Sequence, residues 1–204
     1  MIDDIYPKSI YELIEDFSSL PGIGPKSAVR IVFSLLDNMN NLPQKIGKDL
    51  VEIKNKIKYC KICFNFTEAE FCKICLDERR NRLEVLVVES ALDIPVFEKA
   101  NYRGRYHLLG GLISPLHGRG PEKLHLQELV TRIELEEVSE VILACATSLE
   151  GEATANYLIN LIRERFGDKI LITKLAKGLP LNSTIEYQDP ATLGNAMDNR
   201  IKAN

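Results

Sequence analysis

The sequence predicts an α+β protein of several domains: a helical N-terminal region, a small four-cysteine metal-binding segment, an α/β domain with a mostly parallel sheet, and a C-terminal helical segment. Three observations predict it. Apolar residues recur at helical spacing up to residue 57. Two Cys-x-x-Cys pairs follow at 60–63 and 72–75. Beyond them, runs typical of strands and of helices alternate as far as residue 174.

These changes of pattern set the expected domain boundaries, at residues 1–57, 58–79, 80–177 and 178–204. The chain has 204 residues, of which 45% are apolar and 27% charged, as in ordinary globular proteins. Its apolar runs are much shorter than the roughly 20 residues that a membrane-spanning helix needs. Because its first residues are acidic and unlike a secretory leader, we expect a cytoplasmic protein.

Three amphipathic helices are expected in the N-terminal region. Their apolar residues recur at 10, 13, 14 and 17, at 29, 32, 33 and 36, and at 46, 50, 53 and 57. We expect the third helix to pack on the first two. The first two are joined by Leu20-Pro21-Gly22-Ile23-Gly24-Pro25-Lys26-Ser27, in which the glycines permit a tight turn and Pro25 suits a first helical turn.

This junction is similar to the helix-hairpin-helix motif of DNA-binding proteins. Backbone N–H groups around Gly22 and Gly24, and those that begin the second helix, would point toward one phosphate group, and the helix dipole would add positive potential there. Lys26 and Arg30, one turn apart, would supply two cations. An ordinary helical hairpin without a ligand is the alternative.

Local positive charge also lies elsewhere on a chain whose net charge is −3. Several lysines precede the first cysteine pair, and Arg79, Arg80 and Arg82 follow the second. Such clusters can contact nucleic acid, but they are equally typical of solvated faces that bind nothing. Any nucleic-acid contact must therefore be local.

The two cysteine pairs are separated by eight residues, a spacing typical of a tetrahedral Zn²⁺ site made by Cys60, Cys63, Cys72 and Cys75. Four thiolates leave no open position for water, so the metal would have a structural role. Two disulfides are the alternative, which a cytoplasmic location disfavours. The fifth cysteine, Cys145, lies in an apolar run and is expected in the core.

In the second half, strands are expected at 84–88, 106–109, 141–146 and 169–174, and helices at 92–100, 122–134, 152–166 and 190–201. The glycine- and proline-rich loop at 110–121 lacks the Gly-Lys-Ser/Thr ending of a P-loop, which argues against a nucleotide site. His107, His117 and His125 have no partner at ligand spacing, so we expect them to be structural or exposed.

Acidic residues follow two of the expected strands. Glu89 ends the first strand and Glu150-Gly151-Glu152 follows the third, so these carboxylates are expected at one edge of the sheet, where they could hold Mg²⁺. The run 146–152 resembles the Toprim domain of topoisomerases and primases, in which Asp-x-Asp precedes Glu-Gly-Glu. Ala146 and Ser148 stand at the two Asp positions and cannot hold a metal against phosphate, so phosphodiester chemistry is not expected.

In their order and spacing, five features resemble the bacterial recombination mediator family RecR over nearly the whole chain. They are the hairpin motif, the two cysteine pairs, Val87-Val88-Glu89-Ser90, Gly110-Gly111-Leu112-Ile113-Ser114-Pro115-Leu116 and Glu150-Gly151-Glu152-Ala153-Thr154-Ala155. The resemblance implies a non-catalytic protein that binds single- and double-stranded DNA without sequence preference. It further implies that the protein acts with RecO, and in some settings RecF, to load RecA on single-stranded DNA.

The resemblance also implies a homotetrameric ring, built through the N-terminal helices and the C-terminal segments. Lys26 and Arg30 would line the ring, and Glu89, Glu150 and Glu152 would form an acidic edge for RecO. Two positions depart from the family pattern: Ala146-Thr147-Ser148 replaces Asn-x-Thr, and Phe64 replaces a small residue, often Gly.

Two other functions remain open from the sequence. One is a Mg²⁺-dependent Toprim-type DNA-processing enzyme that uses the three glutamates alone. The other is a protein-assembly module that does not bind DNA.

Overall fold

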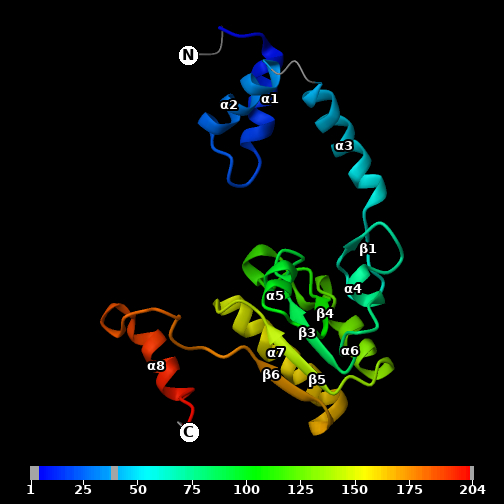
Figure 1. The fold of residues 1–204 in the computed structure, drawn as a ribbon, viewed down its shortest axis with the longest axis vertical. Helices are drawn as coiled ribbons and strands as arrows, with labels where there is room; N and C mark the ends of the chain where they lie inside the picture. The colour runs from blue at the N-terminus through cyan, green and yellow to red at the C-terminus, as the bar shows by residue number, and fades with distance from the viewer. Residues whose placement is uncertain (1–4, 38–40, 203–204) are drawn as a thin grey trace. The chain divides into compact units, whose positions relative to one another are not determined.

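The computed structural model describes residues 5–37 and 41–202 (Figure 1). The chain divides into two compact units, Met1–Ile57 and Lys58–Asn204. The division falls at the end of the expected helical region. Among the helices of the described residues, none is long and apolar enough to cross a membrane.

The first unit contains α1 (Lys8–Ser18), α2 (Pro25–Leu36) and α3 (Leu42–Lys56). Pro25 begins α2, as predicted, because its missing N–H has no partner in a first helical turn anyway. α1 and α2 pack against each other, and Ala28 and Val32 of α2 are fully buried. The ring of Tyr6 meets that of Phe33 edge-on, with 5.1 Å between centroids.

The predicted packing of α3 on the first two helices is only partial, because α3 contacts α2 but leaves much of its apolar face open. Leu50, Val51 and Ile53 are each more than half exposed, and no residue of α3 is buried. The apolar period identifies a face that avoids water, but it does not identify the surface that covers that face. Within the described chain, α3 therefore presents an open apolar stripe.

The second unit is built on a four-stranded sheet of β3 (Glu84–Val88), β4 (Arg105–Leu108), β5 (Glu140–Ala144) and β6 (Leu171–Lys174). The strand order is β4-β3-β5-β6, and every neighbouring pair is parallel. The central strand β3 is a continuous apolar run buried on both faces, as parallel sheets require. The predicted mostly parallel sheet is confirmed.

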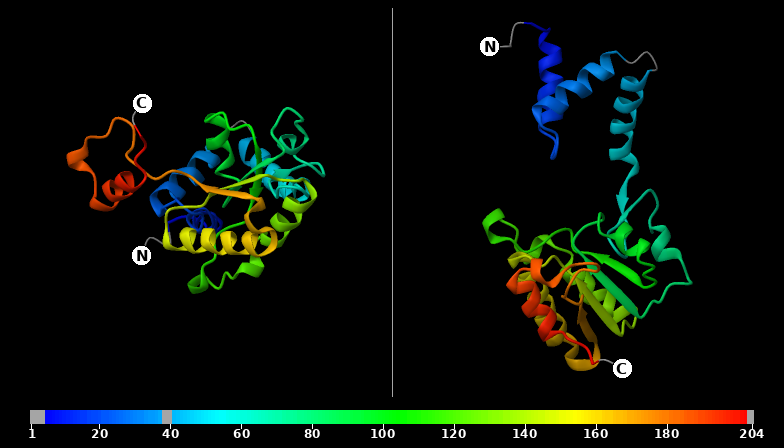
Figure 2. Two further views of the ribbon diagram at one scale, coloured as in Figure 1. Left: turned by 90° about the horizontal axis from the view of Figure 1, so that it is seen from below. Right: turned by 60° about the vertical axis from the view of Figure 1, so that its left-hand side comes forward.

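Helices cover both faces of this sheet (Figures 1 and 2). α6 (Leu126–Leu135) and α7 (Leu149–Phe166) pack on one face, in a cluster that includes Val85, Leu129 and Leu158. On the other face, α5 (Ile94–Lys99) packs together with Phe64 and Ile74 of the cysteine segment. The cysteine segment is therefore part of the wall of this domain.

The remaining elements of the second unit are short. They are β1 (Lys58–Tyr59), β2 (Phe66–Thr67), α4 (Lys73–Leu76), the 3₁₀ turns Pro115–His117, Pro121–Lys123, Gly167–Lys169 and Ile185–Tyr187, and α8 (Pro190–Asp198). β1 and β2 form an antiparallel hairpin. α8 buries none of its residues.

α7 begins at Leu149 rather than at the predicted residue 152. Ser148 caps it, because its hydroxyl oxygen accepts a hydrogen bond from the Gly151 N–H at 3.1 Å. A Cβ at Gly151 would lie 2.0 Å from the carbonyl oxygen of Ala146, so only glycine allows α7 to start this close to the end of β5. Glu150 and Glu152 therefore lie in the first turn of the helix.

Cys145 is half-buried rather than enclosed in the core, because it lies one residue past the end of β5. It packs at the margin of the cluster between the sheet and α7. Burial raises the pKa of its thiol to about 12.

Candidate functional site

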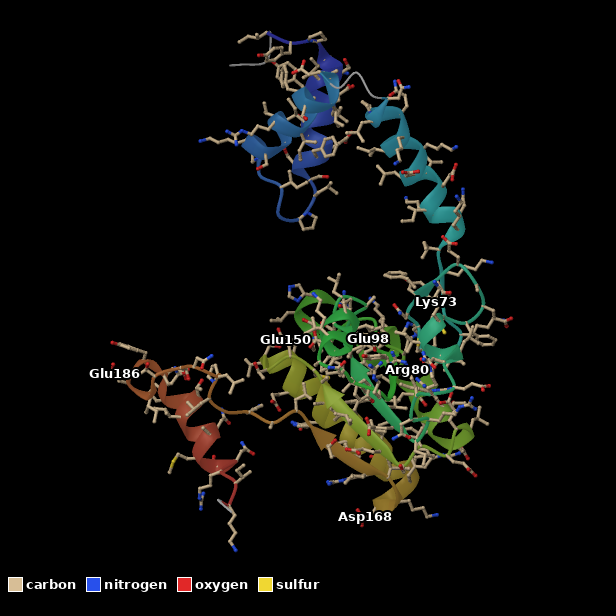
Figure 3. All side chains as sticks on the ribbon, viewed as in Figure 1. Lys73, Arg80, Glu98, Glu150, Asp168 and Glu186 are labelled. Carbon is tan, nitrogen blue, oxygen red and sulfur yellow. The ribbon has the colours of Figure 1, made fainter. Side chains whose placement is uncertain are left out.

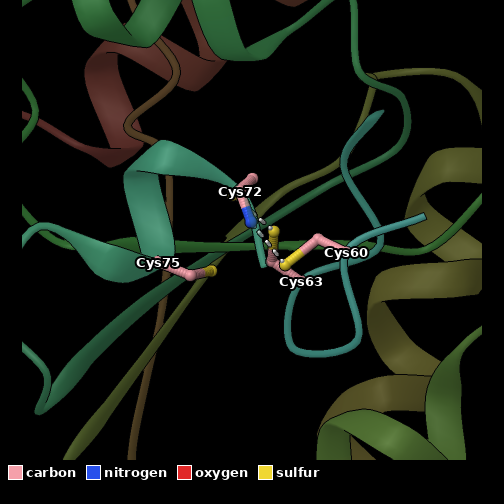
Figure 4. A group of neighbouring side chains, drawn as sticks. All are labelled: Cys60, Cys63, Cys72 and Cys75. Carbon is pink, nitrogen blue, oxygen red and sulfur yellow. Dashed lines mark hydrogen bonds between the residues drawn. The ribbon is translucent and has the colours of Figure 1, made fainter. Parts of the chain in front are cut away.

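Two short pieces of backbone bring the four cysteines of the segment together (Figure 4). Cys60 and Cys63 lie in the turn that joins β1 to β2, where the Cys60 N–H donates to the carbonyl of Asn65 at 2.8 Å. Cys72 is the N-terminal cap of α4, and Cys75 lies within that helix. Each pair is thus held by local hydrogen bonds that fix its spacing.

The geometry of the four sulfur atoms fits a tetrahedral metal site. They all lie within 4.8 Å of one another, and Cys63 Sγ is 3.5 Å from Cys72 Sγ. Sulfur atoms bound tetrahedrally to Zn²⁺ at about 2.3 Å would be roughly 3.8 Å apart. All four residues are buried and none forms a disulfide, which contradicts the disulfide alternative.

Close packing of the thiols also shapes their acidity. Hydrogen bonding to Cys72 raises the pKa of the Cys63 thiol, and hydrogen bonding to Cys63 raises that of Cys75. Hydrogen bonds from Cys63 and Cys75 lower the pKa of Cys72. Zn²⁺ must displace the protons of the thiols that bind it, which makes binding weaker at low pH.

Phe64, the residue that departs from the family pattern, lies just after the first cysteine pair in a left-handed conformation, with φ of +64°. Glycine adopts such a φ without strain, which explains why a small residue is usual there. In this chain the ring of Phe64 stacks on His125, with 3.8 Å between centroids and 11° between planes. It also meets His107 edge-on. These contacts fasten the cysteine segment to the sheet domain.

The three histidines have the structural roles or exposure predicted for them. His107 is fully buried, and its Nε2 donates to the carbonyl of His125 at 2.7 Å. Burial lowers the pKa of His107 to about 3, so the ring is neutral in the folded protein. His117 is exposed, and its Nδ1 lies 2.8 Å from the hydroxyl of Ser114.

Buried arginines form a second link that sequence reasoning missed. Arg105 donates from Nη2 to the carbonyl of Cys75 at 3.2 Å, and its Nη1 lies 3.5 Å from Glu136. Arg132 shares that carboxylate, with Nε at 3.1 Å. The four-residue spacing of Arg132 and Glu136 was a usable signal for a pair on one helix. Nothing local in the sequence indicates the partner on β4.

Arg80 fits neither of the two interpretations given for the basic residues at 79–82, a nucleic-acid contact or a solvated face. Its side chain is buried, and its Nη2 lies 2.5 Å from a carboxylate oxygen of Glu98 (Figure 3). The same carboxyl group accepts a hydrogen bond from the Tyr106 hydroxyl at 2.7 Å. Arg80 therefore stabilises the fold, while Arg79 and Arg82 stay exposed.

In the first unit, the junction of α1 and α2 is a tight turn. The Ile23 N–H donates to the carbonyl of Leu20 at 3.1 Å, Pro21 precedes Gly22, and Gly22 has φ of +83°. These features are typical of a type II turn. Gly24, in contrast, is an extended cap with φ of −80°, so its backbone does not require glycine. Nothing lies within 4 Å of the Cβ position of either residue, which leaves their backbone open to a ligand.

The two cations predicted for this motif lie where α2 begins. Lys26 is in its first turn and Arg30 one turn later, and both are exposed. Neither side chain forms an ion pair within the described part of the chain. No side chain caps the start of α2. Pro25 has no N–H, and the Ser27 N–H donates to the Gly24 carbonyl at 2.9 Å, so among the described residues the Lys26 N–H is the group of this first turn that is left for an anion.

The structure brings only part of the predicted acidic edge together. Glu89 and Glu150 line the same cavity, and the Glu89 carboxylate accepts a hydrogen bond from the Ala146 N–H. Glu152 instead pairs with Lys177 and, at 3.1 Å, with Lys174. Hydrogen bonding to Lys177 and then Lys174 lowers the pKa of Glu152. Among the described residues, only the four cysteines form a close cluster of potential metal ligands.

Comparison with known proteins assigns three parts of this architecture. Residues 10–54 match the family model of the RecR helix-hairpin-helix, residues 57–77 match that of the RecR four-cysteine zinc finger domain, and residues 84–176 match that of the Toprim domain. The four-cysteine cluster is therefore a structural zinc finger, as predicted.

Relatives match over almost their whole length. A protein of Cutibacterium acnes is 46% identical over 97% of both chains. A protein of Paenarthrobacter aurescens is 42% identical over 98% of this chain and 99% of its own, and one of Lactococcus lactis subsp. cremoris is 42% identical over 97% and 98%. All three are called Recombination protein RecR. The chain therefore belongs to the RecR family of recombination proteins.

Proposed function

We propose that this protein is a non-catalytic, cytoplasmic mediator of recombinational DNA repair that binds single- and double-stranded DNA and helps RecO, and in some settings RecF, to load RecA on single-stranded DNA. The observation that carries the proposal is the open turn at the start of α2, beside which lie two exposed cations with no ion pair among the described residues. Membership of a family of recombination proteins supports the same function.

DNA binding at this turn follows from its chemistry. The Lys26 N–H in the first turn of α2 and the positive end of the helix dipole favour a phosphate group. Gly22 and Gly24 have no side chain to block its approach, and Lys26 and Arg30 add charge. None of these groups reads a base edge, so binding is expected to be independent of sequence and sensitive to salt.

A mediator without catalysis is supported by the residues at the Toprim positions. Ala146 has no carboxylate, and the Ser148 hydroxyl is used as the cap of α7. Glu152 is neutralised by two lysines. Glu89 and Glu150 thus remain as the acidic side chains of this edge, and we propose that they contact a basic surface of RecO.

Assembly into a ring-shaped tetramer is supported by apolar surface that the single chain leaves open. The stripe on α3 and, in the predicted C-terminal segment, Leu181, Tyr187 and Ile201 are strongly exposed. Burying such surface between subunits would stabilise an oligomer. Four copies of Lys26 and Arg30 would then act on one DNA molecule and offset the acidic net charge of each chain.

The test compares DNA affinity, by fluorescence anisotropy, of the zinc-loaded protein and of Lys26→Ala/Arg30→Ala. The matched control is Lys99→Ala/Lys169→Ala, which removes the same charge from exposed positions of the second unit. We expect at least tenfold weaker binding for the hairpin variant and little change for the control, with unchanged zinc content. Equal losses in both variants would show a general charge effect and contradict the hairpin assignment.

A second assay addresses mediation. Wild-type protein with RecO is expected to speed RecA assembly on single-stranded DNA covered by its binding protein, and the hairpin variant is not. If the hairpin variant mediates as well as wild type, the protein acts as an assembly module and the DNA-binding function fails.

A further inference from the structure

The second unit contains a cavity of which the proposed function uses only one margin, the acidic residues Glu89 and Glu150. It has a volume of about 970 Å³ and lies between the zinc-finger hairpin, the loop that follows β4, and the start of α7. One wall is aromatic, made by Tyr59, Phe64 and Phe66. The loop wall carries His117, Arg119 and Lys123, and Glu89 and Glu150 also line the cavity.

The aromatic wall presents flat rings to solvent. Tyr59 and Phe66 are directly opposite each other across the β1–β2 hairpin, and their rings stack with 5.4 Å between centroids and 30° between planes. They are 63% and 55% exposed. Phe64 behind them is fixed by its stack on His125. Exposed, stacked aromatic side chains on a hairpin held by zinc are a rigid platform of the kind on which planar groups bind.

The facing loop supplies positive charge close to this platform. Arg119 and Lys123 are exposed, and neither forms an ion pair within the described residues. The Arg119 side chain lies against Gly111. A Cβ added at Gly111 would be 2.4 Å from Arg119 Nη1, so Arg119 can lie this close only because residue 111 is glycine. Lys123 donates one hydrogen bond, to the carbonyl of Gly118 at 2.6 Å, and has two more N–H groups to donate.

From this juxtaposition, we infer that the cavity accepts an unstacked base of single-stranded DNA. The base stacks on Tyr59 and Phe66, and its phosphate binds Arg119 and Lys123. Glu89 and Glu150 repel phosphate, so the backbone is confined to the Arg119 side. Aromatic stacking combined with nearby cations is the usual chemistry of sequence-tolerant single-strand binding. A duplex cannot use the site, because its bases are stacked and paired.

The inference rests on the proposed DNA-binding function and deepens it, since it adds a site that selects single strands. The probe is an oligodeoxythymidine with one 2-aminopurine, whose fluorescence reports stacking, alongside a duplex of the same length. Tyr59→Ala/Phe66→Ala is expected to weaken single-strand binding by about tenfold and to abolish the 2-aminopurine change. Duplex affinity is expected to be unchanged. Tyr59→Phe keeps the ring and should behave as wild type.

A second variant covers the case in which the aromatic substitutions disturb the zinc finger. Arg119→Gln/Lys123→Gln leaves the cysteine segment intact and is also expected to weaken single-strand binding selectively. Arg163→Gln/Arg165→Gln, at exposed sites on α7 outside this cavity, removes the same charge and should have no effect.

Several results would overturn the inference. One is full single-strand affinity and an unchanged 2-aminopurine signal in both cavity variants. Another is an equal loss for single strands and duplex. Cavity variants that bind DNA normally but lose RecO would assign the surface to a protein partner instead. If the cavity variants bind DNA normally while Lys26→Ala/Arg30→Ala does not, the base site fails and the proposed function stands. If Lys26→Ala/Arg30→Ala binds DNA normally while the cavity variants do not, only the hairpin assignment fails.

Discussion

Replacing Gly151 with alanine tests how the start of α7 is fitted to the sheet. The new Cβ would lie 2.0 Å from the Ala146 carbonyl oxygen, and such contacts need at least 3.0 Å, so the two backbones must separate by about 1 Å. This movement strains the Ser148 cap on the Gly151 N–H and the hydrogen bond from the Ile113 N–H to the Thr154 hydroxyl, at 2.9 Å.

The magnitude can be worked from these contacts. Overpacking costs about 1–3 kcal/mol. A lost cap adds about 1 kcal/mol and a lost hydrogen bond about 1 kcal/mol. Alanine returns up to about 1 kcal/mol through its higher helix propensity. The free energy of unfolding is therefore expected to fall by about 2–4 kcal/mol.

Urea denaturation followed by circular dichroism at 222 nm would measure this change. Gly194→Ala in α8 is the matched control, because nothing lies within 4 Å of its Cβ position, and it should be neutral or slightly stabilising. Equal stability of Gly151→Ala and wild type would refute the close approach of α7 to β5.

Three further substitutions or conditions test the links between the zinc finger and the sheet. Glu136→Ala leaves Arg105 and Arg132 buried without their carboxylate, so the free energy of unfolding measured with urea should fall by about 3 kcal/mol. The control Glu134→Ala removes an exposed ion pair with Arg165 and should lower it by less than about 1 kcal/mol. Similar losses of stability in the two variants would argue against the buried ion pairs. At Phe64, glycine should be more stable than alanine by about 1 kcal/mol because φ is positive, and the opposite order in thermal unfolding would exclude the left-handed backbone. The pKa of His107 is about 3 in the folded protein, below its value in the unfolded chain, so the unfolded chain takes up the proton first as the pH falls. The stabilisation by neutral His107 is complete above pH 6.5, and the free energy of unfolding then falls by up to about 1.4 kcal/mol per pH unit below it. The same decline in a zinc-saturated His107→Gln protein would contradict this assignment to His107.

Local chemistry explains which features the sequence could predict. Cys60, Cys63, Cys72 and Cys75 lie in two short turns, so their spacing alone specifies a tetrahedral site. The apolar run of β3 and the Pro-Gly turn before α2 are equally local signals. Each depends on neighbours in the chain, and each appears in the structure where it was expected.

Long-range pairing explains what the sequence could not predict. Arg105 meets Glu136 across 31 residues, and the left-handed Phe64 is matched to His125, more than 60 positions away. The stripe on α3 was recognised as apolar, but a helical period cannot say whether its cover lies in the same chain. Glu152 was assigned to an acidic edge because the lysines that neutralise it, at the end of β6 and just beyond it, are 22 and 25 positions away in the sequence.

A phosphate contact at the hairpin can be tested through the salt dependence of DNA binding, measured as the slope of log K against the log of salt concentration for wild type and Lys26→Ala/Arg30→Ala. Each phosphate contact contributes about 0.7–0.9 to the magnitude of this slope. Loss of both cations is predicted to make the slope shallower by roughly 1.4 on single strands and roughly 1.8 on duplex for each subunit that contacts DNA. An unchanged slope, with zinc content and fold intact, would contradict a phosphate contact at the hairpin.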